Sequence, residues 1–176
     1  MSLQVELYLE NYFDDFSSRA VNIGDNYPIL PETWENWFQQ WLEVLEDYLP
    51  TAPSYEISLR LTTDTEIQTL NSQYRQQDKP TDVLAFASLE ADLPQSQEML
   101  ASMPLYLGDI IVSMDTAQRQ AQQQEHSLST ELAWLTAHGL LHLLGWDHPQ
   151  EESLLQMLNQ QVVLLKKIGI IISLES

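Results

Sequence analysis

The chain has no cysteine, and this absence excludes several chemistries at once. A protein without thiols has no disulfide, no thiolate nucleophile and no zinc site built from cysteine. The absence also fits a reducing compartment, where disulfides are rare. Any metal site must therefore use other side chains.

Basic residues are scarce. The 176 residues include seven Lys and Arg against 26 Asp and Glu, for a formal net charge of −19. A charge of this sign disfavours non-specific binding to anionic membranes or to bulk nucleic acid. It leaves room for a local nucleic-acid site, in which a few basic side chains or a metal ion meet the phosphates.

Long hydrophobic runs are also missing. Residues 1–16 have neither the basic region nor the uninterrupted apolar stretch of a signal peptide. The apolar segment 162–172 is interrupted by Lys166, Lys167 and Gly169, and it is too short to span a bilayer. We therefore expect a cytoplasmic protein that has no membrane partner.

The remaining composition is that of a globular protein, with 44% hydrophobic and 9% aromatic residues. The length suits one domain with one core, so we expect residues 1–176 to form a single domain with a variable N-terminal segment at 1–30. Apolar residues, three tryptophans among them, recur every three or four positions after Pro31. We interpret this stripe as the buried face of a helix rather than as a platform for stacking bases.

Alternating and helical patterns follow one another along the chain. Strands are expected at 4–9, 55–62, 83–87 and 107–113, and helices at 31–49, 64–74, 116–124, 129–144 and 151–167. Asp64 and Ser129 are expected to cap two of these helices. The order predicts an α+β fold, in which helices flank a small mixed sheet and a metal-binding helix and turn lie near the C-terminal part.

Three of the four histidines lie within the eleven residues HGLLHLLGWDH, as His138, His142 and His148. A spacing of four places the first two on one face of a helix. Gly145 suits the left-handed conformation that ends a helix, so the chain can reverse and return the third histidine to the same point. Three imidazoles with an open fourth position are typical of catalytic zinc, although imidazole also suits other metals. We expect His126 to lie on the surface without a partner.

Glycine follows the first histidine of this motif. The spacing H-x-x-x-H-x-x-G-x-x-H matches the metzincin metallopeptidases, in which a glutamate at that position is the general base. Gly139 stands in its place here, which counts against peptide hydrolysis. Three neutral imidazoles leave the charge of a divalent metal undiminished, and such a site favours an anionic substrate such as a phosphodiester.

Three stretches resemble the YbeY endoribonucleases, bacterial proteins of ribosomal RNA maturation. They are HGLLHLLGWDH, LNSQYRQQDKPTDVLAF at 70–86 and LGDIIVS at 107–113, and they occur in the expected order across residues 55–165. The resemblance implies one zinc ion on His138, His142 and His148. It implies metal-dependent cleavage of single-stranded RNA, in 16S ribosomal RNA 3′ end processing and late ribosome quality control. The implied partners are small-subunit ribosomal RNA, small-subunit ribosomal proteins and a ribosome-assembly GTPase.

Arg75 matches the functionally important arginine of that family, so we expect it to be catalytic beside the three histidines. A guanidinium near a metal can hold a phosphate and stabilise charge that develops during its reaction. Alternatively, Arg75 only interacts with carbonyls at a helix end. Lys79 is a weaker candidate for a phosphate contact, and no role is assigned to Asp109 or Asp147.

Two rival functions remain open at this point. The chain could be a non-catalytic ribosome assembly factor, whose metal only ties the helix to the following loop. The less favoured rival is a metzincin-like metallopeptidase, for which Gly139 is the discriminating residue.

Overall fold

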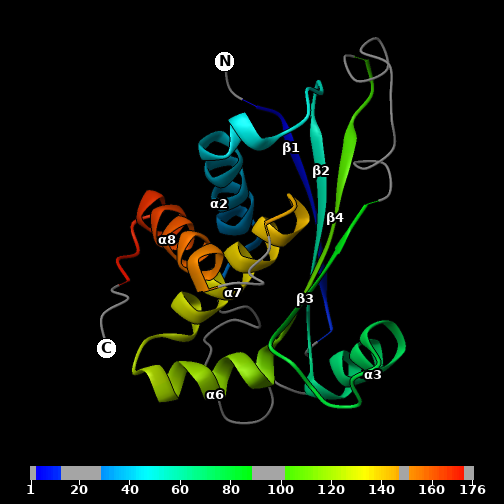
Figure 1. The fold of residues 1–176 in the computed structure, drawn as a ribbon, viewed down its shortest axis with the longest axis vertical. Coiled ribbons are helices and arrows are strands. Elements are labelled where there is room, and N and C mark those ends of the chain that lie inside the picture. The colour runs from blue at the N-terminus through cyan, green and yellow to red at the C-terminus, as the bar shows by residue number, and fades with distance from the viewer. Residues whose placement is uncertain (1–2, 13–28, 89–101, 147–150, 173–176) are drawn as a thin grey trace.

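The computed structural model describes residues 3–12, 29–88, 102–146 and 151–172, and it has an α+β fold (Figure 1). The strands are β1 (Val5–Asn11), β2 (Tyr55–Thr62), β3 (Val83–Ala87) and β4 (Leu105–Ser113). The helices are α2 (Pro31–Val44), a 3-10 turn η1 (Glu46–Tyr48), α3 (Asp64–Arg75), α6 (Met114–Gln124), α7 (Leu128–Leu143) and α8 (Glu151–Lys167). The α+β prediction is therefore confirmed.

The four strands form one mixed sheet in the order β1-β2-β4-β3. The strands β1, β2 and β4 run parallel to one another, whereas β3 runs antiparallel to β4 and forms an edge. The register of β2 against β4 shifts at Glu56 and Ile57, where Gly108 adopts a φ of +142°. That angle is open to glycine and strained for other residues, so the glycine permits the irregularity.

Helices cover the two faces of the sheet unequally. The helices α2, α7 and α8 pack on one face, and α3 lies over part of the other (Figure 1). The tryptophan stripe of α2 belongs to the main core, as predicted, and Nε1 of Trp41 donates to the carbonyl oxygen of Leu164 at 2.9 Å. A much smaller cluster of Ile67, Leu84 and Ile111 lies under α3. A large part of the α3 face of the sheet is thus left for polar side chains.

The two predicted helix caps are wrong. The hydroxyl of Thr63, not Asp64, accepts the first capping hydrogen bond of α3, and Ser127, not Ser129, caps α7 through the amide of Thr130 at 3.0 Å. In both cases an upstream hydroxyl lies on extended backbone, so the helix begins at the next residue. The expected left-handed glycine after α7 is confirmed, because Gly145 has a φ of +93°.

Within the described ranges, none of the helices combines the length and the apolarity needed to cross a membrane.

Candidate functional site

The centre of the candidate site is a pair of histidines one turn apart on α7. The Nε2 atoms of His138 and His142 lie 3.0 Å apart, and their rings meet edge to face with centroids separated by 4.5 Å. Two nitrogen ligands on one tetrahedral zinc, each at its usual bond length, lie roughly 3.3 Å apart. The two imidazoles therefore fit a shared metal ion, with their Nε2 atoms as the ligand atoms.

The third predicted ligand cannot be placed. His148 lies outside the described residues, as does Asp147. Among the residues that are described, no three His, Asp or Glu side chains are grouped closely enough to hold a metal ion. Ligation of zinc by His148 therefore stays a prediction.

A buried glutamine orients His138. Gln161 on α8 is fully buried, its Nε2 donates to the carbonyl oxygen of Trp134 at 3.2 Å, and its Oε1 lies 3.0 Å from Nδ1 of His138. Because the carbonyl of Trp134 can only accept, the amide must present its oxygen to the histidine. Nδ1 of His138 then carries the hydrogen, and a neutral ring keeps the lone pair of Nε2 directed at His142.

Arg75 lines the same pocket as the histidine pair but comes from another element. It is the last residue of α3, and its Nη2 donates to the carbonyl oxygen of Ala85 on the edge strand β3 at 2.9 Å. Its guanidinium carbon also lies 5.3 Å from the ring centroid of Phe86. The helix-end alternative, a contact with the carbonyls of its own helix, is thus not the arrangement seen. Arg75 instead contacts Ala85 and Phe86 on the edge strand of the sheet.

These side chains share one pocket of about 370 Å³, lined by Arg75, Asp82, His138, Gly139 and His142 together with residues 83–85 of β3. Asp82 was not expected from the sequence. Its Oδ1 accepts from the amide of Val83 at 2.8 Å, so the carboxylate secures the start of β3. Lys79 is exposed on the loop after α3 and is not among the residues that line the pocket.

Gly139 has a packing role that the motif did not suggest. The residue is buried, and a Cβ built on it would lie 2.8 Å from Cγ2 of Ile110 and 3.3 Å from Cγ2 of Val83. Glycine therefore lets α7 lie directly against β3 and β4. The same contact leaves no room for the glutamate of a metallopeptidase without displacing the sheet or the helix.

The surroundings of His126 differ from the expectation, and those of Asp109, to which no role was assigned, are now defined. His126 is not an unpartnered surface residue, because its Nε2 lies 2.6 Å from Oε1 of the buried Glu131 at the start of α7. The sequence interpretation failed there because the partner lies in the next helix. Asp109 does not approach the histidines and instead accepts a hydrogen bond from the hydroxyl of Tyr106.

Known proteins resemble this chain over nearly its whole length. The family model described as endoribonuclease YbeY matches residues 21–169. A protein named endoribonuclease YbeY from Nostoc sp. is 68% identical over 96% of this chain and 92% of its own. Its namesake from Trichormus variabilis is 66% identical over 98% of both chains.

A solved structure shares the fold. The solution structure of TM1509 from Thermotoga maritima matches with a TM-score of 0.53 and 22% identity, over 93% of this chain and 89% of that one. At this identity the likeness speaks for the fold alone. Matched by the family model over most of its length and by relatives of high identity, the chain belongs to the YbeY family of endoribonucleases.

Proposed function

We propose that this protein is a zinc-dependent endoribonuclease specific for single-stranded RNA. It would act in the maturation of small-subunit ribosomal RNA, at the 16S 3′ end, and in late ribosome quality control. The observation that carries the proposal is the shared pocket, which is lined by Arg75 together with His138 and His142. A cation and a pair of metal-ligand nitrogens in one pocket suit a phosphodiester.

The side chains divide the chemistry among them. His138, His142 and the predicted His148 would hold the zinc ion, which would act as a Lewis acid and lower the pKa of a water molecule. Gln161 keeps His138 in the tautomer that leaves Nε2 available. Arg75 holds the phosphate and stabilises negative charge that develops on its oxygens. One of its five N–H donors is committed to Ala85, and this bond fixes where the others point.

The negative charge of the molecule implies that partner molecules bring the RNA substrate to it. A net charge of −19 repels free RNA, and Arg75 is the one basic residue among those lining the pocket in the described part of the chain. We infer that small-subunit ribosomal proteins and a ribosome-assembly GTPase deliver ribosomal RNA to the enzyme in the cytoplasm. Delivery by partners would replace the general electrostatic attraction that this surface does not provide.

The test is cleavage of a labelled RNA fragment that spans the 16S 3′ end. The wild-type protein is compared with His142→Ala and Arg75→Gln, purified identically, with and without a chelator and with zinc restored. We expect cleavage to require zinc and His142, and to fall by about a hundredfold or more in Arg75→Gln, as when one group stabilising transition-state charge is removed. Lys166→Gln at the end of α8 removes the same charge away from the pocket and should cleave normally.

The other outcomes separate the rival functions. Equal cleavage by His142→Ala and wild type would reveal a contaminating nuclease. Alternatively, the wild type cleaves neither free RNA nor immature small subunits and loses much thermal stability on chelation. That result would support an assembly factor whose metal only ties the helix to the following loop. Hydrolysis of a peptide would support the metallopeptidase, although the close contact of Gly139 with Ile110 counts against it.

A further inference from the structure

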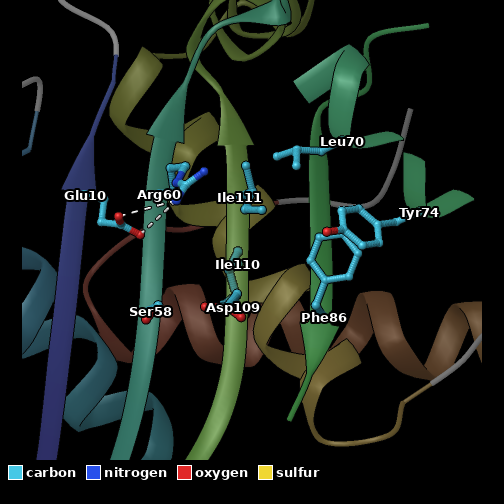
Figure 2. A pocket seen from close by; sticks show the side chains of 9 residues that line it. All are labelled: Glu10, Ser58, Arg60, Leu70, Tyr74, Phe86, Asp109, Ile110 and Ile111. Carbon is cyan, nitrogen blue, oxygen red and sulfur yellow. Dashed lines mark hydrogen bonds and ion pairs between the residues drawn. The ribbon is translucent and has the colours of Figure 1, made fainter. Parts of the chain in front are cut away.

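The sheet carries a second pocket on the face opposite α7. Its volume is about 360 Å³, and it lies between α3 and the strands (Figure 2). Leu70, Tyr74 and Phe86 line one side, and Ser58, Arg60 and Asp109 belong to the polar remainder. A pocket with an aromatic wall facing a few hydrogen-bonding groups has the composition of a site for a flat polar ring.

The aromatic wall presents unused ring surface. Tyr74 and Phe86 meet edge to face with centroids 5.3 Å apart, and 61% of Tyr74 is exposed although it lies on the apolar side of α3. Exposed aromatic rings beside a nucleic-acid site commonly stack on unpaired bases. The pair therefore provides a stacking surface next to, but not inside, the candidate catalytic pocket.

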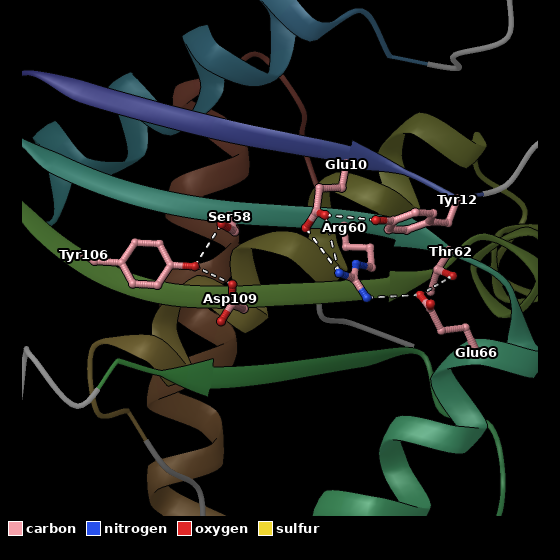
Figure 3. A network of polar contacts seen from close by, with 8 residues as sticks. All are labelled: Glu10, Tyr12, Ser58, Arg60, Thr62, Glu66, Tyr106 and Asp109. Carbon is pink, nitrogen blue, oxygen red and sulfur yellow. Dashed lines mark hydrogen bonds and ion pairs between the residues drawn. The ribbon is translucent and has the colours of Figure 1, made fainter.

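The polar side is arranged to reject a phosphate. Arg60 lies between Glu10 and Glu66, with nitrogen–oxygen distances of 3.4 Å to both, so its positive charge is already matched (Figure 3). Asp109 adds a further carboxylate, which accepts from the hydroxyl of Tyr106. The surplus negative charge disfavours phosphate but suits the N–H groups on the edge of a base.

Arg75 joins the two pockets across the edge of the sheet. Its guanidinium lies over Phe86, which lines the second pocket. Arg75 itself lines the pocket of His138 and His142. Because β3 is an edge strand in the described sheet, an RNA strand can cross it at this point. Its phosphate would lie at Arg75 while an adjacent base turned toward Phe86 and Tyr74.

We propose that this second pocket is a nucleobase subsite for the nucleotide next to the phosphate held by Arg75. The base stacks on the exposed ring of Tyr74, beside Phe86, and directs N–H donors at Asp109, which favours guanine because its N1 and N2 donors are adjacent. This proposal rests on the proposed nuclease function, because that function makes RNA the ligand. It adds to that function a preference for one base near the cut.

The test compares short single-stranded oligonucleotides in which each nucleotide in turn lacks its base. Binding to the zinc-free protein is followed by fluorescence anisotropy, and KM and kcat are measured separately with the zinc-loaded enzyme. We expect one position at which loss of the base weakens binding and raises KM by roughly tenfold, the scale of one stacked base. In Tyr74→Ala the intact oligonucleotide should bind equally weakly, with no further loss at that position, and Tyr74→Phe should bind normally.

Tyr8→Ala is the matched control, because Tyr8 is 46% exposed on the same face of the sheet but does not line the pocket. Equal binding by Tyr74→Ala and wild type would overturn the subsite, and so would an equal effect of Tyr8→Ala. A titration of guanosine against N-acetyl-arginine amide, followed by NMR, separates a base from a basic protein segment. Shifts at Phe86 and Asp109 with the arginine derivative alone would also overturn it.

Failure of the two proposals would look different. If the wild type cleaves RNA but binds every oligonucleotide with a missing base as tightly as the intact one, the nuclease function is supported and the subsite is wrong. If the wild type cleaves no RNA but Tyr74 still couples to one base, the nuclease function is overturned, while the subsite remains as an RNA-binding site.

Discussion

Gln161 and His138 form a hydrogen bond that determines which nitrogen of the histidine faces the pocket. The amide oxygen lies 3.0 Å from Nδ1, and the fully buried glutamine is itself held by the carbonyl of Trp134. Nε2 of His138 consequently faces Nε2 of His142 at 3.0 Å. A side chain from α8 thereby orients the nitrogen on α7 that we propose binds zinc.

Replacing this glutamine should weaken zinc binding. Gln161→Leu removes the acceptor for Nδ1 and is expected to lower zinc affinity by about 10- to 100-fold, as loss of such orienting partners does. Competition with a chromophoric chelator measures the affinity directly. Long-range ¹⁵N–¹H spectra should show His138 losing its single Nδ1–H tautomer.

Two variants calibrate that measurement. Gln161→Glu keeps an acceptor for Nδ1 and should bind zinc with affinity near or above that of the wild type. Gln156→Leu makes the same exchange at an exposed position of α8 and should change nothing. If all three proteins bound zinc equally well, the orienting role would be wrong.

Gly139→Ala should destabilise the protein through one neighbour. The added methyl would lie 2.8 Å from Cγ2 of Ile110, whose branched side chain has little freedom to move. Overpacking of this kind costs about 1–3 kcal/mol, against a gain of roughly 0.5–1 kcal/mol from the better helix propensity of alanine. The free energies of unfolding in urea of Gly139→Ala, Ile110→Ala, the double variant and the wild type form a double-mutant cycle. Ile110→Ala should cost less when alanine occupies position 139, and strict additivity would contradict the contact.

Asp64 should make stability depend on pH in the acid range. Burial alone would raise the pKa of this carboxyl, but hydrogen bonds from Ser113 and Thr116, both 2.6 Å, and from Arg119 at 2.8 Å hold it below its usual value. A lowered pKa in the folded state stabilises above the pKa of the unfolded chain, and this contribution disappears as pH falls through the folded value.

Asp64→Asn should therefore lower the free energy of unfolding at pH 7 by about 1–2 kcal/mol, a range that discounts the exposed Arg119. The difference from the wild type should shrink as pH falls below about 4, where the unfolded carboxyl becomes protonated, and should vanish below the lowered pKa of the folded state. Unfolding in urea at several pH values measures this, with Asp78→Asn as an exposed control. A difference that is constant with pH would show that the charge of Asp64 is not responsible.

Tyr106 should ionise late in an alkaline titration. Burial and the hydrogen bond to Asp109 raise its pKa to about 12. The phenolate absorbance of the wild type minus that of Tyr106→Phe isolates this group, and Asp109→Asn should bring the transition back toward 10. Since the folded pKa exceeds the unfolded one, the stabilisation is complete below pH 10 and is lost as pH rises toward 12. An unchanged transition in Asp109→Asn would disprove the coupling.

The elements and fold class were predictable because they depend on local patterns. Alternation marked β2, and the tryptophan spacing marked α2. Helix caps were less predictable, since Ser127, Ser129 and Thr130 all lie near the start of α7 and each residue type can cap. The choice of Ser127 over Ser129 depends on which residue lies on extended backbone, and tertiary packing decides that.

The site shows the same division between local and distant information. A spacing of four is enough to predict that His138 and His142 share a face. No local pattern relates His138 to Gln161, which lies on the next helix. Gly139 was interpreted as a missing catalytic base, whereas its contact with Ile110 depends on how α7 meets the sheet. The second pocket joins β1, β2, β4, β3 and α3, and no single stretch of sequence marks it.

The order of strands has a consequence for how the chain is made. Residue 5 pairs with residue 55, and residue 55 pairs with residue 105, so neither parallel pair can form between segments close in sequence. Loop closure must precede any gain from such pairings, which places this topology among the slower folders. During synthesis, all four strands emerge before α7, the helix that carries the two described histidines. The candidate site is thus completed late, on a sheet whose strands are already available, and a chain interrupted before α7 would lack His138 and His142.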